Sequence, residues 1–376
     1  VGERGGGNNG KAAQLKGRKA ILEGGPETSG DFVDVSFNPI SRGDTYALTS
    51  DGFLLSFDSS RILDKWVNLK SKSVRSLSAT DRFVVCACGN GLVRMFHPAT
   101  LEYICTLPKP PPFHSQVDGK PPHATTWPDA IAVSLTPHSQ RAVCVFSDRS
   151  IFVWDVRDPA KVCRCRALHA HSASVWDVEF ASDQACANAG APPGSFFSCS
   201  SDSTIRLWSL PPVPSEMDLP TLGQAPALIT KELRAMLRVG EAEGGSIEDA
   251  TGGGVRCLRV SPDHSKIACG DRAGNLRMYG LKSSRMELQV MLEAHDSEVM
   301  CVEFSGQWVA TCSRDRLVHV FDAAQQCDLV RTFDEHAAAV TSIKFAGKGR
   351  RLISCGADKA CIFRSVEPGK DGEGMS

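Results

Sequence analysis

Seven short segments of the chain share one pattern of hydrophobic and polar positions. Each has apolar residues at its first, fourth and sixth positions and, in most copies, a small residue at the third. The segments are 32–39, 74–79, 130–137, 175–180, 255–262, 299–304 and 340–345. A spacing of three and then two differs from the strict alternation of a regular strand and indicates a β-bulge near the start of the strand. The pattern therefore predicts seven equivalent bulged strands.

A second pattern follows each of these strands, in which a polar turn residue stands six positions before an aromatic one. The turn residue is acidic in five copies, namely Asp51, Asp148, Asp202, Asp315 and Asp358, and it is Asn90 and Ala273 in the others. The later position holds Phe57, Phe96, Trp154, Trp208, Tyr279, Phe321 and finally Arg364. The chain thus contains seven copies of a repeat of roughly 40 residues, lengthened in places by insertions.

A histidine stands four residues before the first valine of three strands, as His171, His295 and His336. Together with the aspartate and tryptophan positions, this resembles the WD repeat, in which each unit is a four-stranded blade of a β-propeller. The resemblance covers nearly the whole chain and implies an all-β, seven-bladed β-propeller. Because one blade cannot bury both faces of its small sheet, the blades stack in a ring.

The two ends of the chain are expected to meet in the last blade. After 360–366 the sequence becomes polar and glycine-rich, so residues 367–376 are predicted to be a disordered tail. Arg18–Glu23 forms a strand without a blade of its own, and we expect it to supply the fourth strand of the blade 339–366. Residues 1–15 are predicted to be a flexible lead-in, and the propeller to occupy residues 16–366.

Three insertions interrupt the repeats. The proline-rich segment 107–128 is expected to be a solvated loop, with a docking segment for a proline-binding module, or a contact through Phe113 or Trp127, as the alternatives. The segment 181–194 is expected to be a hairpin connection. Within 211–253, residues 226–240 have helical spacing, but the fourth blade still needs an outer strand, so we expect that strand at Leu233–Val239.

The composition narrows the classes of function. A net charge of −1 over 376 residues argues against a dedicated nucleic-acid or membrane surface. Fifteen cysteines without any C-x-x-C pair favour buried, reduced thiols and a cytoplasmic location over a metal or disulfide framework. We expect a soluble, monomeric propeller without cofactor, metal or catalytic residues.

The serine, histidine and aspartate of "SCSSDSTIRLW" (198–208) allow a catalytic or a structural interpretation. A catalytic set would be unique, whereas the pairing of His171 with Asp202 recurs as His295 with Asp315 and His336 with Asp358. We therefore predict a blade staple, meaning a hydrogen-bonded set that ties the outer loop of a blade to its own sheet. Its residues are His171, Asp202, Trp208, His295, Asp315, His336, Asp358, Asp148, Trp154 and Asp51. The blade with Ala273 lacks the acid and is expected to be held by packing alone.

Several longer matches lie outside the general blade pattern. They include "ILDKWVNLK" (62–70), "SIFVWDVRDPAKV" (150–162), "EAHDSEV" (293–299) and "DEHAAAVTSIKFA" (334–346). These stretches resemble the second propeller of the mitogen-activated-protein-kinase-binding WD-repeat scaffold family, which has a paralogue at spindle poles. The resemblance implies a fragment of a scaffold at the centrosome, spindle pole or basal body whose partners are other proteins. A structural component of the centriole, basal body or ciliary axoneme is the alternative, and an enzymatic or ligand-binding propeller is a remote one.

The bulges also predict where a partner would bind. They place the second residue of each inner strand at the mouth of the central channel, namely Val33, Arg75, Ile131, Trp176, Arg256, Met300 and Thr341. Trp, Met and Arg are enriched in protein–protein interfaces, which makes Trp176, Arg256, Met300 and Arg75 the candidate contacts. Alternatively, Trp176 only caps the channel.

Overall fold

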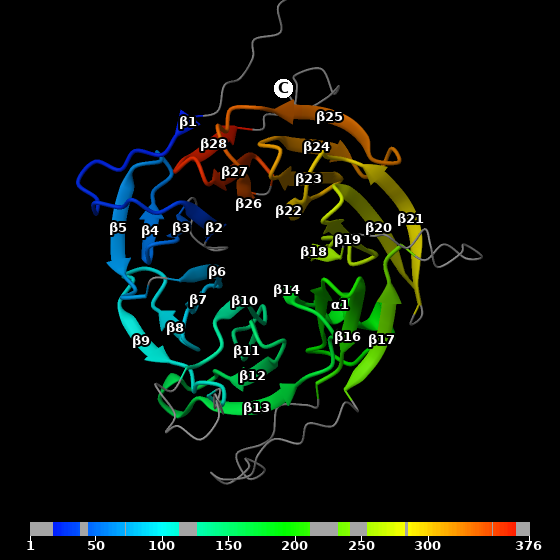
Figure 1. Ribbon diagram of the computed structural model, residues 1–376, viewed down its shortest axis with the longest axis horizontal. Helices are drawn as coiled ribbons and strands as arrows, with labels where there is room; N and C mark the ends of the chain where they lie inside the picture. The colour runs from blue at the N-terminus through cyan, green and yellow to red at the C-terminus, as the bar shows by residue number, and fades with distance from the viewer. Residues whose placement is uncertain are drawn as a thin grey trace, which may run out of the picture.

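The computed structural model describes residues 18–37, 44–71, 73–112, 126–210, 232–240, 254–282, 285–347 and 349–365. Their strands form seven four-stranded antiparallel sheets, which follow one another around a ring (Figure 1). The predicted all-β, seven-bladed propeller is therefore confirmed. No helix among these residues is long and apolar enough to cross a membrane.

In the first three blades the strands follow the chain order from the innermost strand outward. The first contains β2 (Phe32–Phe37), β3 (Thr45–Thr49), β4 (Phe53–Phe57) and β5 (Leu63–Asn68). The second contains β6 (Val74–Ala79), β7 (Val84–Cys88), β8 (Val93–Phe96) and β9 (Tyr103–Thr106). The third contains β10 (Ala130–Leu135), β11 (Arg141–Phe146), β12 (Ile151–Asp155) and β13 (Cys163–Leu168), with a 3₁₀ turn at Pro159–Lys161.

The other blades continue the same order. The fourth contains β14 (Val175–Phe180), β15 (Phe196–Ser200), β16 (Thr204–Trp208) and β17 (Leu233–Arg238). The fifth contains β18 (Val255–Val260), β19 (Lys266–Asp271), β20 (Asn275–Lys282) and β21 (Arg285–Glu293). The sixth contains β22 (Val299–Ser305), β23 (Trp308–Ser313), β24 (Val318–Asp322) and β25 (Asp328–Phe333). The seventh contains β26 (Val340–Ala346), β27 (Arg351–Gly356), β28 (Cys361–Ser365) and β1 (Arg18–Lys19).

The hydrophobic core lies between the blades. The buried apolar residues form seven clusters, and each cluster joins two neighbouring blades, including the last and the first. In the cluster that closes the ring, Phe57 of the first blade packs edge-on against Phe363 of the seventh, with ring centroids 6.1 Å apart. The apolar positions of the repeat thus stabilise the ring by packing blade against blade.

The amino-terminal strand closes the ring. β1 pairs antiparallel with β28, and the Ala20 N–H donates to the Cys361 carbonyl at 2.8 Å. The strand is shorter than the predicted Arg18–Glu23 because the chain then crosses to the first blade. There Ile21 forms a parallel bridge with Ile62, and its N–H donates to the Arg61 carbonyl at 2.9 Å. The same segment therefore completes the last blade and ties it to the first.

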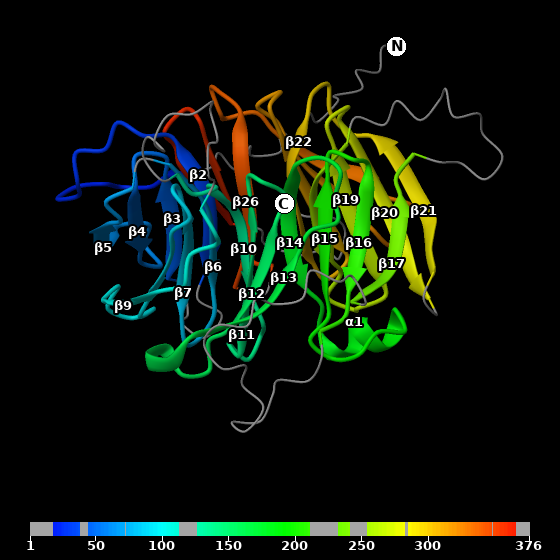
Figure 2. The same cartoon turned by 60° about the horizontal axis from the view of Figure 1, so that its bottom comes forward.

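The insertions agree only partly with the sequence-based expectation. The segment 181–194, expected to be a plain hairpin connection, contains the short helix α1 (Asp183–Asn188). This helix lies on one face of the ring (Figure 2). Ser182 caps this helix, because its hydroxyl accepts a hydrogen bond from the Ala185 N–H. The outer strand of the fourth blade lies at Leu233–Arg238, where the strand interpretation placed it. The lead-in 1–15, the tail 367–376 and the segments 113–125, 211–231 and 241–253 lie outside the described residues.

Candidate partner-binding site at the channel mouth

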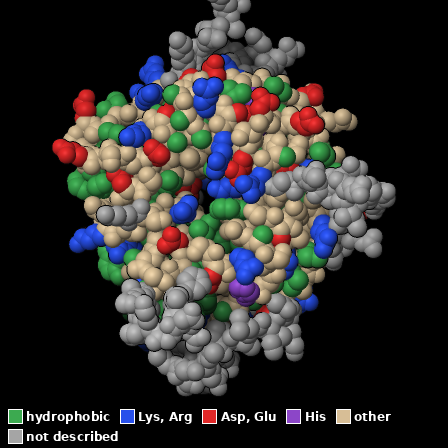
Figure 3. All heavy atoms as spheres, viewed as in Figure 1, with side chains coloured by type: hydrophobic (Ala, Val, Ile, Leu, Met, Phe, Trp, Pro, Cys, Tyr) green, Lys and Arg blue, Asp and Glu red, His purple; other side chains and the backbone are tan. Residues whose placement is uncertain are grey.

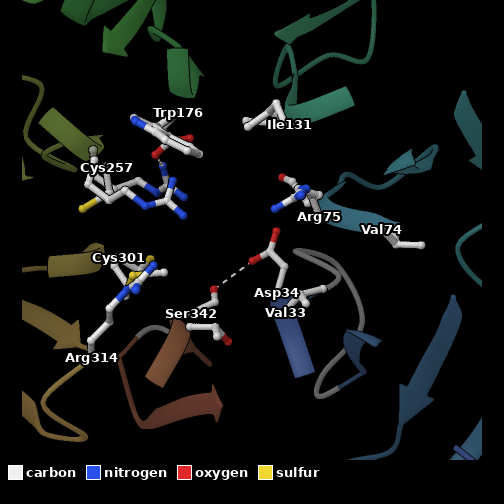
Figure 4. A pocket seen from close by; sticks show the side chains of 17 residues that line it. Val33, Asp34, Val74, Arg75, Ile131, Trp176, Cys257, Cys301, Arg314 and Ser342 are labelled. Atoms are coloured by element: carbon white, nitrogen blue, oxygen red, sulfur yellow. Dashed lines mark hydrogen bonds and ion pairs between the residues drawn. The ribbon is translucent and has the colours of Figure 1, made fainter. Parts of the chain in front are cut away.

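A β-bulge interrupts the first strand pair of every blade. The register shifts fall at Val33, Arg75, Ile131, Trp176, Arg256, Met300 and Thr341. All seven of these side chains line one cavity of about 280 Å³ on the ring axis (Figure 4). We call this rim the channel mouth. The extra residue of each bulge leaves the ladder and points its side chain toward the axis, which is why seven distant sequence positions converge there.

Trp176 and Arg256 form a stacked pair at the channel mouth. The Arg256 guanidinium lies over the indole ring, 4.3 Å from its centroid. The Trp176 Nε1–H donates to the Ser201 hydroxyl at 2.6 Å, which fixes the ring from its other end. The pair is half-buried, so an ordered aromatic face remains accessible beside a cation.

The rim of the channel mouth is positively charged. Glu298 accepts three guanidinium groups, from Arg314 at 2.8 Å, Arg256 at 3.4 Å and Arg272 at 3.7 Å. One carboxylate cannot neutralise three cations, and exposed Arg75 has no ion-pair partner among the described residues. Lys and Arg side chains gather beside the central hollow on this face (Figure 3). The channel mouth is therefore suited to a partner with negative charge.

The two acids just below the channel mouth connect blades. Asp34 accepts the Leu77 N–H of the second blade and the Ser342 hydroxyl of the seventh, each at 2.8 Å. Asp177 accepts the Leu258 N–H of the fifth blade at 3.2 Å. Burial raises the pKa of Asp34, while these hydrogen bonds oppose that shift. Both acids stand at the third position of their strands, and the strand pattern alone does not indicate this connecting role.

A chain of ion pairs continues deeper along the inner strands. Arg259 contacts Asp177 at 2.9 Å and Glu303 at 3.5 Å, and Lys344 also pairs with Glu303. Glu179 accepts the Val260 N–H at 3.0 Å, and burial raises its pKa to about 7. These acids are engaged by guanidinium, ammonium or backbone N–H groups of neighbouring blades. These contacts connect neighbouring blades, and each acid already interacts with a group of this chain.

The three predicted histidine–aspartate pairs each lie within hydrogen-bond distance. Nδ1 of His171, His295 and His336 lies 2.9, 2.8 and 3.0 Å from a carboxylate oxygen of Asp202, Asp315 and Asp358, respectively. Each Nε2 faces a strand hydroxyl, at 2.8 Å from Ser198, 2.8 Å from Thr311 and 2.7 Å from Ser354. The Trp208 Nε1–H also donates to Ser198, at 2.8 Å. The hydrogen-bonded unit thus occurs three times, on blades four, six and seven.

Of the other predicted staple residues, Asp51 and Asp148 lie in similar turns without a histidine, and Trp154 lies on β12. Asp51 accepts hydrogen bonds from the Thr28 and Thr49 hydroxyls and from the Gly30 N–H. Asp148 accepts the N–H of Ser150 at 3.0 Å. The Trp154 Nε1–H donates to the Pro108 carbonyl of the preceding blade at 3.2 Å.

The expectation that packing alone holds the blade with Ala273 is wrong. Asp271, two residues earlier, is buried and accepts hydrogen bonds from the backbone of Ala273 and Asn275 at 2.9 and 2.8 Å. It also pairs with the buried guanidinium of Arg277. The carboxylate has moved to the end of the preceding strand, so the spacing rule that found the other acids missed it.

Comparisons with known proteins agree with this architecture. A family model described as WD domain, G-beta repeat matches residues 162–209, 245–279, 286–322 and 327–363. The last two matches begin in the outer strand of one blade and end in the third strand of the next, which is the offset that the closure of the ring also uses.

Longer similarities extend over almost the entire chain. It is 37% identical over 398 residues to mitogen-activated protein kinase-binding protein 1 of Mus musculus. This alignment covers 96% of this chain and 25% of that protein. It is also 35% identical over 357 residues to WD repeat-containing protein 62 of Sus scrofa. This second alignment covers 88% of this chain and 23% of that protein. The chain therefore spans about a quarter of the length of these curated relatives. It is a seven-bladed WD-repeat β-propeller and a homologue of mitogen-activated protein kinase-binding protein 1 and WD repeat-containing protein 62.

Proposed function

We propose that this propeller is a non-catalytic platform for protein–protein interaction and that its partner binds at the channel mouth. The observation that carries the proposal is the convergence of seven bulged side chains, one from each blade, on a single cavity. Four of them are Trp176, Arg256, Met300 and Arg75, which are residue types enriched in protein interfaces.

The charge of the channel mouth indicates the chemistry of the partner. Arg75, Arg256 and Arg314 line the cavity, and Glu298 is the carboxylate that pairs with two of them. An acidic segment would gain from the uncompensated guanidinium groups, and an apolar or aromatic side chain beside it would pack on Trp176 and Met300. We infer that the partner presents an acidic segment with at least one large apolar residue.

The relatives support a cellular setting for the propeller. One relative is named for binding a mitogen-activated protein kinase, and the sequence resemblance adds a paralogue at spindle poles. We propose that the propeller works inside a larger cytoplasmic scaffold at the centrosome or spindle pole.

The test is a quantitative comparison of captured proteins. The tagged chain, its Arg75→Glu variant and its Met300→Ala variant are used to capture proteins from cells, and bound proteins are measured by mass spectrometry. Met291→Ala is the matched control, because Met291 is 52% exposed on the outer strand β21, away from the channel mouth. We expect at least one partner to bind the wild type and Met291→Ala and to be lost with both other variants. Equal recovery with all four proteins would contradict the proposal.

A further inference from the structure

The sixth blade contains a group of metal-ligating side chains outside the channel mouth. A cavity of about 520 Å³ is lined by His295, Asp315 and His319, among other residues. One potential ligand atom from each of the three lies within 4.8 Å of the other two. Two imidazoles and one carboxylate beside a solvent-sized space form a donor set used for Zn²⁺ and related divalent ions.

His319 stands at a strand position that other blades fill with a different residue type. In the fourth blade the residue four positions after the turn acid is Arg206, and its Nη2 lies 3.6 Å from the Asp202 carboxylate. The fifth blade has Arg277 at this strand position, paired with Asp271. The sixth blade has His319 instead, and the ion pair found for Asp315 within the described part of the chain is with His295. Asp315 therefore faces a place where two sister blades, the fourth and the fifth, hold a permanent cation.

Among the residues that the structure describes in the sixth blade, no N–H donor fixes the tautomer of the buried histidine in the way found in the fourth and seventh blades. In the fourth blade the Trp208 N–H donates to the Ser198 hydroxyl, which favours a hydroxyl hydrogen directed at His171 Nε2 and a hydrogen on Nδ1 facing Asp202. In the seventh blade the Arg364 guanidinium has the same role toward Ser354, at 2.6 Å.

The corresponding residue of the sixth blade is Phe321, which has no N–H to donate. The Thr311 hydroxyl can then accept an Nε2–H of His295, so that a metal ion can replace the hydrogen between Nδ1 and the Asp315 carboxylate. Nδ1 of His319 lies 2.8 Å from the Thr332 hydroxyl, which can orient that ring and leave its Nε2 as the ligand atom. Hydroxyl partners of this kind commonly fix ligating imidazoles.

We propose that His295, Asp315 and His319 bind a divalent transition-metal ion of the Zn²⁺ class, with a water molecule from the cavity as the fourth ligand. The ion would take the place of the arginine of the sister blades and hold the turn of the sixth blade to its sheet. A site of this kind would couple the stability of this blade to metal supply.

The experiment measures Zn²⁺ binding by the full chain by calorimetry, and Co²⁺ binding by visible absorption. His319→Arg restores the residue type of the fourth blade and removes one ligand without a loss of volume. A second variant, with Cys105, Cys163 and Cys165 replaced by Ser, removes the half-buried thiols that could bind the same ions. Mg²⁺ is the control ion, because it prefers oxygen ligands.

We expect one Zn²⁺ per chain in the wild type and in the thiol variant. We expect at least about a 10-fold weaker binding in His319→Arg, since even loss of a residue that only orients a ligand costs that much. The Co²⁺ spectrum should lack a thiolate charge-transfer band. Equal Zn²⁺ affinity in His319→Arg, loss of binding in the thiol variant, or no binding by the wild type would each overturn the proposal.

Discussion

Arg364 shows that the N–H donor at the last position of the repeat need not be an indole. Its Nη1 donates to the Ser354 hydroxyl at 2.6 Å, much as the Trp208 indole donates to Ser198 at 2.8 Å. The rest of the guanidinium pairs with Glu335 and lies over Phe333. The buried N–H donor is thus an indole in the fourth blade and a guanidinium in the seventh, whereas Phe321 of the sixth blade supplies none.

The first prediction concerns Asp202. Asp202→Ala leaves the buried Nδ1–H of His171 and the Thr204 hydroxyl without their acceptor. We expect a loss of about 1–3 kcal/mol in the free energy of unfolding, measured by urea denaturation. Asp358→Ala should behave alike, while Asp81→Ala, at an exposed position, should change little. A parent-like unfolding curve for Asp202→Ala would remove Asp202 from the blade staple.

Asp271 leads to a second prediction with a larger effect. Asp271→Ala leaves the buried guanidinium of Arg277 without its carboxylate, which we expect to cost about 3–5 kcal/mol. Adding Arg277→Met removes the unpaired charge and should recover a large part of that loss. The measurement is the unfolding free energy of the single and double variants. If the double variant is as unstable as the single one, the ion pair is not the reason for the effect.

The third prediction is a loss of stability on acidification. Burial lowers the pKa of His171 and of His336 below the ordinary value of 6.5, although the paired aspartates oppose the shift. The unfolded chain therefore binds protons first, so this contribution is complete above pH 6.5 and is lost as the pH falls through the folded pKa. Burial alone would raise the pKa of Asp202, but hydrogen bonds from His171 and Thr204 lower it, so its contribution is lost only at more acidic pH.

The measurement is the melting temperature between pH 7.5 and pH 5. Glu179, whose pKa burial raises to about 7, contributes with the opposite sign over this interval, so the measurement is made in the Glu179→Gln background. There we expect the melting temperature to fall as the pH drops below about 6.5. His169→Gln is the control, since His169 is exposed and its loss should leave this dependence unchanged. A melting temperature that stays constant or rises over the same interval would contradict the assignment.

At the scale of single elements, the sequence predicted those features that the repeat itself encodes. The 1–4–6 apolar spacing located all seven inner strands and their bulges, because the residue that leaves the ladder interrupts the alternation. The polar, glycine-rich sequence after residue 366 predicted closure by the amino-terminal segment, and the pairing of β1 with β28 confirms it.

Features that depend on contacts between strands or between blades could not be predicted from the repeat pattern. The carboxylates of Asp34 and Asp177 accept backbone N–H groups of other blades, and nothing in their own strands indicates this. The shift of the turn acid to Asp271 depends on Arg277 being buried on the next strand. The candidate metal group was missed because His319 has meaning only beside His295, from which it is separated in sequence and close in space.

The fourth prediction tests ring closure. Deletion of residues 1–25 removes β1 and the Ile21 bridge, which exposes the edges of β28 and β5. We expect a lower melting temperature and a broader transition in calorimetry. Ala20→Pro should have a smaller effect of the same sign, since it removes the N–H that donates to Cys361. Deletion of residues 1–15 is the control, and equal melting of all these proteins would rule out closure by this strand.

At the scale of the whole molecule, the hydrophobic core and the proposed partner site occupy different parts of the ring. The seven apolar clusters and the histidine–aspartate pairs lie between and within blades, whereas the seven bulged residues line the axis. The proposed interaction surface therefore depends on the closed ring, and one of its seven bulged side chains, Thr341, also joins the seventh blade to the first by donating to the Phe32 carbonyl at 2.8 Å. Substitutions at the channel mouth should separate binding from folding.

The most direct test is a paired measurement of partner affinity and melting temperature on Trp176→Ala, Tyr103→Ala and Asp202→Ala, with a partner recovered by the capture experiment. Tyr103 is the matched aromatic control, 58% exposed on the outer strand β9. We expect Trp176→Ala to weaken binding by more than about 1 kcal/mol with a smaller loss of stability, and Tyr103→Ala to bind like the parent. Asp202→Ala should lose stability and, where it is folded, retain affinity. Parent-like binding by Trp176→Ala, or loss of binding by Asp202→Ala with unchanged melting, would contradict a partner site at the channel mouth.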